Sequence, residues 1–93
     1  MAALNRLTLR QLQAVQAVYE AGRVSAAAER LNISQSAASV LLGQAEDSLG
    51  ARLFDRTTRS LAPTKLAEQI IGLVSRILGD IDTLGTVAED MLG

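Results

Sequence analysis

Two clusters of polar side chains carry the chemistry that this sequence offers. The first cluster supplies hydroxyl and amide groups: Ser25, Ser34, Gln35, Ser36 and Ser39. The second cluster supplies guanidinium groups and hydroxyls: Arg52, Arg56, Thr57, Thr58 and Arg59. Gln and Ser can hydrogen-bond to base edges, whereas Arg and Thr commonly bind phosphate oxygens. The two clusters together point to recognition of a nucleic acid.

Enzyme chemistry has few candidates in this chain. The 93 residues contain neither Cys nor His, which excludes thiol nucleophiles, disulfides and the usual zinc ligand sets. The carboxylates are scattered, so we predict no acid–base pair, no enzyme activity and no metal or other cofactor. Arg6 and Arg10 come early and no long apolar run follows, which argues against a signal peptide or membrane span and favours the cytoplasm.

Two helices joined by a tight turn must position the first cluster. We expect a hydroxyl cap at the start of each helix, from Ser25 and from Ser34. Asn32 tolerates the left-handed conformation that ends a helix, and Ile33 can fill the angle between the helices. This pattern predicts a helix-turn-helix whose second helix, over residues 35–49, can enter the DNA major groove.

The spacing along residues 35–49 predicts which side chains would face a groove. At about 100° per residue, one narrow stripe is apolar and must face the core: Ala38, Leu42, Ala45 and Leu49. The opposite positions are the ones that a groove would meet: Ser36, Val40, Gly43 and Asp47, with Ser39 on the flank.

The flanking segments complete the expected fold. A first helix capped by Thr8, with Gln11 as its capping-box partner, supplies core residues: Leu9, Leu12, Val15, Val18 and Tyr19. Residues 52–55 and 59–61 are predicted to form a short hairpin, or wing, and Pro63 is expected to end its second strand. We therefore predict a mainly α fold, a winged helix-turn-helix of three helices plus a two-stranded wing, over residues 1–63.

A long helix capped by Thr64 is predicted to fill residues 64–93. Apolar side chains recur along it at alternating spacings of three and four: Ala67, Ile70, Val74, Ile77, Ile81, Leu84, Ala88 and Met91. A sustained heptad seam is typical of one helix pairing with another, so we predict a homodimer interface along this seam.

The net charge of −1 is unusual for a nucleic-acid-binding chain, but it is unevenly distributed. Residues 1–65 carry eight basic and five acidic side chains, whereas residues 66–93 carry one basic and five acidic side chains. The average therefore conceals a basic winged part and an acidic final helix.

Three segments resemble the LysR-type transcriptional regulators: Leu9-Arg10-Gln11-Leu12, the run from Arg30 to Ser39 and the run from Leu49 to Arg59. The resemblance extends from about Leu7 to the end. It implies a bacterial transcription factor that binds a double-stranded DNA operator with dyad symmetry and dimerises through an antiparallel pair of long helices. Family members continue into a small-molecule-sensing domain, absent from these residues, so an effector would bind only there.

The resemblance also assigns roles to single residues. Gln35 and Ser39 match residues that the family uses in the groove, and residues 56–59 match its wing motif. Ser25 and Ser34, at helix N-termini, could also meet phosphates.

The third helix departs from the family pattern, because Val40 and Gly43 stand where Arg or Lys is common and no basic residue lies between Arg30 and Arg52. Val40 could touch a thymine methyl, or specificity could come from DNA shape and an Arg in the minor groove. The lack of basic residues in this helix and the acidic final helix also motivate an alternative function, a helical protein-interaction and dimerisation module with only weak non-specific DNA binding. Arg56 and Arg59 speak against that alternative.

Overall fold

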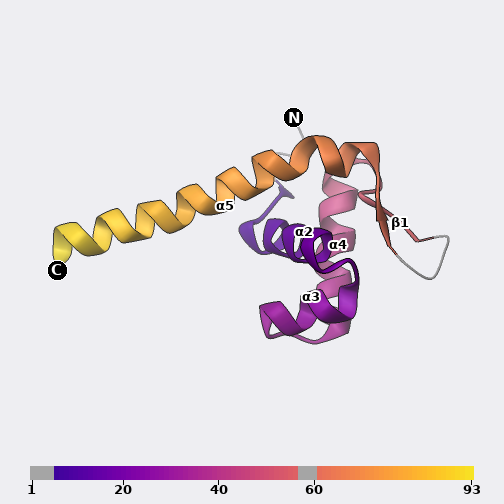
Figure 1. The fold of residues 1–93 in the computed structure, drawn as a ribbon, viewed down its shortest axis with the longest axis horizontal. Helices are drawn as coiled ribbons and strands as arrows, with labels where there is room; N and C mark the ends of the chain where they lie inside the picture. The colour runs from indigo at the N-terminus through magenta and orange to yellow at the C-terminus, as the bar shows by residue number, and fades with distance from the viewer. Residues whose placement is uncertain (1–5, 57–60) are drawn as a thin grey trace.

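The computed structural model describes residues 6–56 and 61–93. The elements in chain order are α2 (Leu9–Ala21), α3 (Val24–Leu31), α4 (Gln35–Leu49), β1 (Phe54–Asp55), β2 (Ala62–Pro63) and α5 (Lys65–Leu92). Helices α2, α3 and α4 pack together, β1 and β2 form an antiparallel pair, and α5 extends away as a long arm (Figure 1). The predicted mainly α winged helix-turn-helix with a long final helix is confirmed.

Local signals account for most helix ends. Thr8 and Gln11 form the predicted capping box at the start of α2, and the hydroxyl of Ser34 accepts a hydrogen bond from the N–H of Ala37 at 3.0 Å. Asn32 ends α3 in the left-handed conformation, with φ 59° and ψ 42°. These three predictions are confirmed because each depends only on groups within one turn of chain.

The predicted cap at Ser25 is wrong. Helix α3 begins two residues earlier than that cap requires, at Val24, with the extended residue Arg23 as its N-cap and no side-chain hydrogen bond there. Val24 packs against the hydrophobic core, which draws it into the helix. Ser25 is therefore already helical and lacks the extended backbone from which a hydroxyl reaches the first-turn N–H groups.

The core is built from Phe54 and from small and branched side chains, and every element except β2 contributes to it. Its buried members are Val15, Ala17, Val18, Ala27, Leu42, Ala45, Leu53, Phe54 and Ala67. The predicted stripe of α4 is confirmed, since Ala38, Leu42 and Ala45 are fully buried and Leu49 packs against the core. The predicted core position of Leu9 is wrong: it is 42% exposed, because it lies about 160° around α2 from the buried Gln11.

A buried carboxylate holds the wing to α4. Glu46 is 7% exposed, and one of its oxygens accepts hydrogen bonds from the N–H groups of Leu53 at 2.7 Å and Phe54 at 3.4 Å. Its other oxygen pairs with the guanidinium group of Arg56 at 3.1 Å. Because a pair of two-residue strands has few hydrogen bonds of its own, these contacts fix where β1 starts relative to α4.

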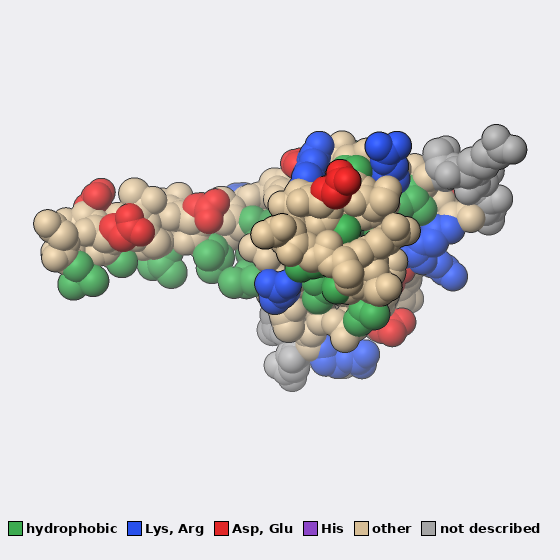
Figure 2. Space-filling view, turned by 90° about the horizontal axis from the view of Figure 1, so that it is seen from below, with side chains coloured by type: hydrophobic (Ala, Val, Ile, Leu, Met, Phe, Trp, Pro, Cys, Tyr) green, Lys and Arg blue, Asp and Glu red, His purple; other side chains and the backbone are tan. Residues whose placement is uncertain are grey.

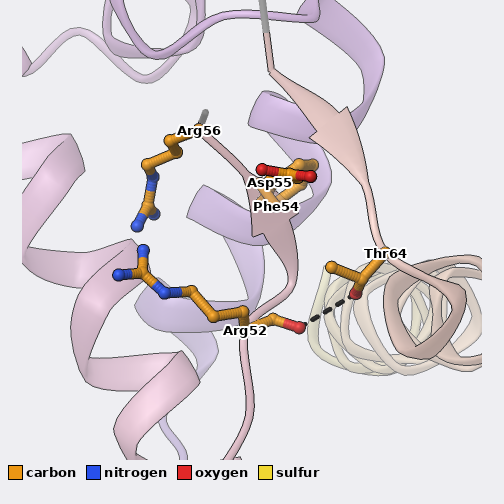
Figure 3. Close-up of a pocket in the computed structure, with 5 residues that line it drawn as sticks. All are labelled: Arg52, Phe54, Asp55, Arg56 and Thr64. Atoms are coloured by element: carbon orange, nitrogen blue, oxygen red, sulfur yellow. Dashed lines mark hydrogen bonds between the residues drawn. The ribbon is translucent and has the colours of Figure 1, made fainter. Parts of the chain in front are cut away.

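Thr64 joins the wing to α5. Its N–H donates to the carbonyl of Leu53 at 2.9 Å, and its hydroxyl donates to the carbonyl of Arg52 at 2.9 Å (Figure 3). The same hydroxyl accepts a hydrogen bond from the N–H of Ala67 as the predicted cap of α5. Pro63 ends the second strand as predicted, but it does so as the last residue of β2, where it pairs with Phe54. Proline is tolerated there because β2 is an edge strand.

The first turns of α5 belong to the compact part of the molecule. Ala67 is 1% exposed and Val74 is 3% exposed, while Ile70 packs against the core. The side-chain amide of Gln16 in α2 donates to the hydroxyl of Ser75 at 3.0 Å. The prediction that Ala67 and Val74 lie in a dimer interface is wrong, because their own chain covers them. The division at residue 63 stays a prediction from sequence.

The rest of α5 is an exposed arm with an apolar edge. Figure 2 shows hydrophobic side chains in a row along this edge. The exposed large apolar residues of α5 are Leu73, Ile77, Ile81, Leu84, Val87, Met91 and Leu92. Five members of the predicted seam are therefore exposed: Ile77, Ile81, Leu84, Ala88 and Met91. In the described part of the chain, no helix has the length and apolar character required to cross a membrane.

The wing anchor predicts an order of stabilities. We expect Glu46→Ala to lower the free energy of unfolding by about 2 kcal/mol, because the buried N–H of Leu53 loses its acceptor. Glu46→Gln should cost less, since an amide oxygen can still accept that bond. Urea denaturation followed by circular dichroism measures both. The control Glu29→Ala, at an exposed position of α3, should stay within about 0.5 kcal/mol of the wild type. A Glu46→Ala variant as stable as this control would contradict the anchor.

Candidate nucleic-acid interface

The first half of α4 presents most of the first predicted cluster to solvent. Ser34, Gln35, Ser36 and Ser39 are exposed, and Val40 is 57% exposed. The buried stripe of α4 packs on the other helices, so these side chains lie on the solvent-facing side of the helix. Such a surface has the width to enter a DNA major groove. Ser25 is also exposed, but it lies on α3 and does not cap that helix.

The turn between α3 and α4 is fixed by backbone hydrogen bonds. The N–H of Asn32 donates to the carbonyl of Glu29 at 3.1 Å, and the N–H of Ile33 donates to the carbonyl of Ala28 at 3.0 Å. Ile33 itself is half-buried. These bonds close the end of α3 and direct the chain into α4, so the angle of the exposed helix is built into the turn.

Two arginines lie at the base of the wing. Arg52 and Arg56 extend to the same side of β1, whereas Asp55 extends to the other side (Figure 3). Both arginines line a hollow that they share with Gly43, Glu46 and Asp47 of α4. Two guanidinium groups on one side offer the forked donors that suit phosphate oxygens.

The two arginines differ in how they are held. Arg56 gives one hydrogen bond to Glu46, and its side chain remains 36% exposed, so other donors of its guanidinium group stay free. Within residues 6–56 and 61–93, the guanidinium group of Arg52 has no ion-pair partner. Thr57, Thr58 and Arg59 lie outside the described residues, and their role stays a prediction.

Two further arginines at this surface escaped the sequence analysis. Arg10, in the first turn of α2, lines a hollow together with Ser36, Val40 and Gln44. Arg6 lines a neighbouring hollow that also includes Gln44. No local pattern marks these arginines as neighbours of α4, because their proximity depends on how α2 packs against it.

Glu46 also escaped the sequence analysis, although a signal was present. It lies one turn after Leu42, close to the apolar stripe of α4, where a carboxylate requires partners to offset its burial. An acidic residue beside a core stripe, followed within ten residues by Arg56, was therefore a usable indication of a structural ion pair.

Comparison with known proteins places this geometry in a family. Residues 9–68 match the model described as bacterial regulatory helix-turn-helix protein, lysR family. The HTH-type transcriptional regulator PtxR of Pseudomonas aeruginosa is 39% identical over 90 residues, covering 97% of this chain and 29% of the relative. The regulator PgrR of Escherichia coli is 35% identical over 88 residues, covering 95% of this chain and 29% of the relative.

A solved structure agrees with these matches. The crystal structure of the CbnR DBD–DNA complex superposes with a TM-score of 0.84 at 30% identity, covering 94% of this chain and 100% of the CbnR chain. The chain spans 29% of the length of PtxR and of PgrR. On the match over residues 9–68, the chain belongs to the lysR family of bacterial regulatory helix-turn-helix proteins.

Proposed function

We propose that this chain binds double-stranded DNA sequence-specifically, as the DNA-binding portion of a bacterial cytoplasmic transcription regulator. Helix α4 enters the major groove, the wing contacts phosphates or the minor groove, and α5 joins two copies. The observation that carries the proposal is the exposed polar face of α4, held by the Asn32 turn beside Arg52 and Arg56. The relationship to the CbnR DBD–DNA complex supports the same assignment.

Base reading would fall to the first half of α4. Gln35 can bond adenine through both ends of its amide, and Ser36 and Ser39 can donate to or accept from several bases. Val40, at 57% exposure, is available for a thymine methyl. The competing proposal is that specificity comes from DNA shape rather than from these contacts.

A binding-site selection separates the two proposals. If α4 reads bases, Gln35→Ala should cost about 1–3 kcal/mol on the best site and much less on random DNA. Val40→Ala should reduce the preference for thymine over uracil at one position, since those bases differ only by the methyl group. The shape proposal is favoured if both variants keep the wild-type base preferences and binding depends strongly on central base pairs of the site that the protein does not contact.

The wing should supply positioning contacts. We expect Arg56→Ala and Arg59→Ala to weaken binding to specific and random DNA alike and to flatten the salt dependence by about one unit of slope each. Fluorescence anisotropy across a salt titration measures this slope. Arg56→Ala also leaves Glu46 without its cation, so a urea titration should accompany that variant. Normal binding by both variants would remove the wing from the interface.

We infer that α5 forms the homodimer along its exposed apolar edge. A single chain leaves Ile77 44%, Ile81 42% and Leu84 65% exposed, and each is worth about 1.5–3 kcal/mol when fully buried. The dimer would present two copies of α4 to an operator with dyad symmetry. Heptad spacing alone leaves the helix direction open, and the antiparallel arrangement is a proposal from the family resemblance.

Sedimentation tests the dimer. Ile77→Asp should convert it to a monomer, because a carboxylate on the apolar edge cannot be buried without a partner. Thr86→Asp adds the same charge at an exposed position nearly opposite that edge and should leave the dimer intact. A dimer that survives Ile77→Asp would place the interface elsewhere.

We propose that any response to a small-molecule effector resides in a segment outside these 93 residues. If the wild-type chain binds a selected site only weakly and no more tightly than random duplex DNA, the alternative of a helical interaction module is favoured instead.

A further inference from the structure

The helix proposed to enter the groove brings no positive charge with it. No Lys or Arg lies between Arg30 and Arg52, so α4 is without a cation over its whole length. A helix inserted into the major groove has a phosphate strand on each side of it, because the groove is only about 12 Å wide. Cations that bind these strands must therefore come from elements beside α4.

One such set is already described at the wing. Arg52 and Arg56 line the hollow that includes Gly43 and Glu46 of α4. At about 100° per residue, Ser36, Val40 and Asp47 form the outward strip of α4, and Glu46 lies on one side of it. The wing arginines thus stand along one side of the outward strip.

The other side of the strip is bordered by the start of α2 and by Arg6, which precedes that helix. Arg10 lines the hollow that includes Val40 and Gln44, and Arg6 lines the one that includes Gln44 and Ser48. Gln44 falls on the opposite side of the outward strip from Glu46. Arg6 and Arg10 consequently form a second row of positive charge, on the side of α4 away from the wing.

The charges around this second row leave it available to an anion. Both arginines are exposed, and neither has an ion-pair partner within residues 6–56 and 61–93. The first turn of α2 carries no acidic residue, so its N-terminal dipole adds to the positive potential. Asp47, which lines hollows on both sides, lies on the outward strip, where bases rather than phosphates would meet it.

We propose that Arg6 and Arg10 bind the DNA phosphate strand on the α2 side of α4. We call this pair the α2 edge. Arg52 and Arg56 would bind the phosphate strand on the opposite side of the groove. The inference rests on the proposed DNA-binding function and adds to it a source of positive charge that α4 itself lacks. The contact positions the helix in the groove and carries no base preference of its own.

A salt titration of DNA binding tests the α2 edge. The 93-residue chain and its variants are titrated with a random-sequence duplex and with a selected site, and the slope of log K against log salt is measured. Arg6→Ala and Arg10→Ala should each reduce the slope by about one unit, and the double variant by about two. Both duplexes should be affected equally. Arg10→Lys should restore the wild-type slope, because Lys also neutralises a phosphate.

Arg76→Ala is the matched control. It removes one exposed positive charge from α5, and it should leave the slope unchanged. Helical circular dichroism of each variant should match the wild type, since Thr8 and Gln11 still cap α2. If Arg6→Ala and Arg10→Ala both keep the wild-type slope, the proposed phosphate contact of the α2 edge is wrong. It is also wrong if Arg10→Ala changes the base preference in a selection, because Arg10 would then be a base-reading residue. If the wild-type chain itself shows no salt-dependent binding to either duplex, the proposed DNA-binding function is wrong.

Discussion

The relation between the wing and α4 depends on one buried carboxylate. Glu46 accepts backbone N–H bonds from the start of β1 and holds the guanidinium group of Arg56 at 3.1 Å. The two strands of the wing have two residues each, so few hydrogen bonds join β1 to β2. These bonds alone would not hold the wing in one place against α4. Burying a carboxylate is costly unless every oxygen is occupied, and here the cost is offset by donors that only the folded wing provides. The wing and α4 are therefore fixed as one unit.

This unit separates two tasks that nucleic-acid recognition requires. Positioning depends on charge and is tolerant of sequence, whereas reading depends on the hydrogen-bonding pattern of base edges. In this chain the outward surface of α4, which has no basic residue, is bordered by arginines from the wing on one side and by Arg6 and Arg10 at the start of α2 on the other. The absence of basic residues from α4 is then compatible with DNA binding, because the cations stand beside the helix instead of on it.

The long helix couples the compact part to the arm without a flexible joint. Its first turns are part of the core through Ala67 and Val74, and the bond between Gln16 and Ser75 adds a polar contact to α2. The direction of the arm is consequently set by packing within one chain. In a dimer through the exposed edge, that direction would determine the spacing of the two α4 helices along a duplex, since each arm is continuous with its own core.

The sequence by itself determined the features that depend on neighbouring residues. Helix starts at Thr8, Ser34 and Thr64 and the helix end at Asn32 depend on N–H and carbonyl groups within one turn of chain. The residue types at these four positions were therefore enough to predict them. The apolar stripe of α4 was equally predictable, because helical periodicity is a property of spacing alone. The family resemblance rested on the same local segments.

Only the tertiary structure decided what covers each face and which distant residues meet. Heptad spacing marked Ala67, Val74 and Ile77 as one apolar face, but their own core buries the first two and leaves the third exposed. Ser25 had the right residue type for a cap, yet the packing of Val24 moved the helix start past it. Arg10 lies beside Val40 only because α2 packs on α4. Periodicity shows which side chains share an apolar face. Long-range packing alone decides whether that face is buried by its own chain or left exposed.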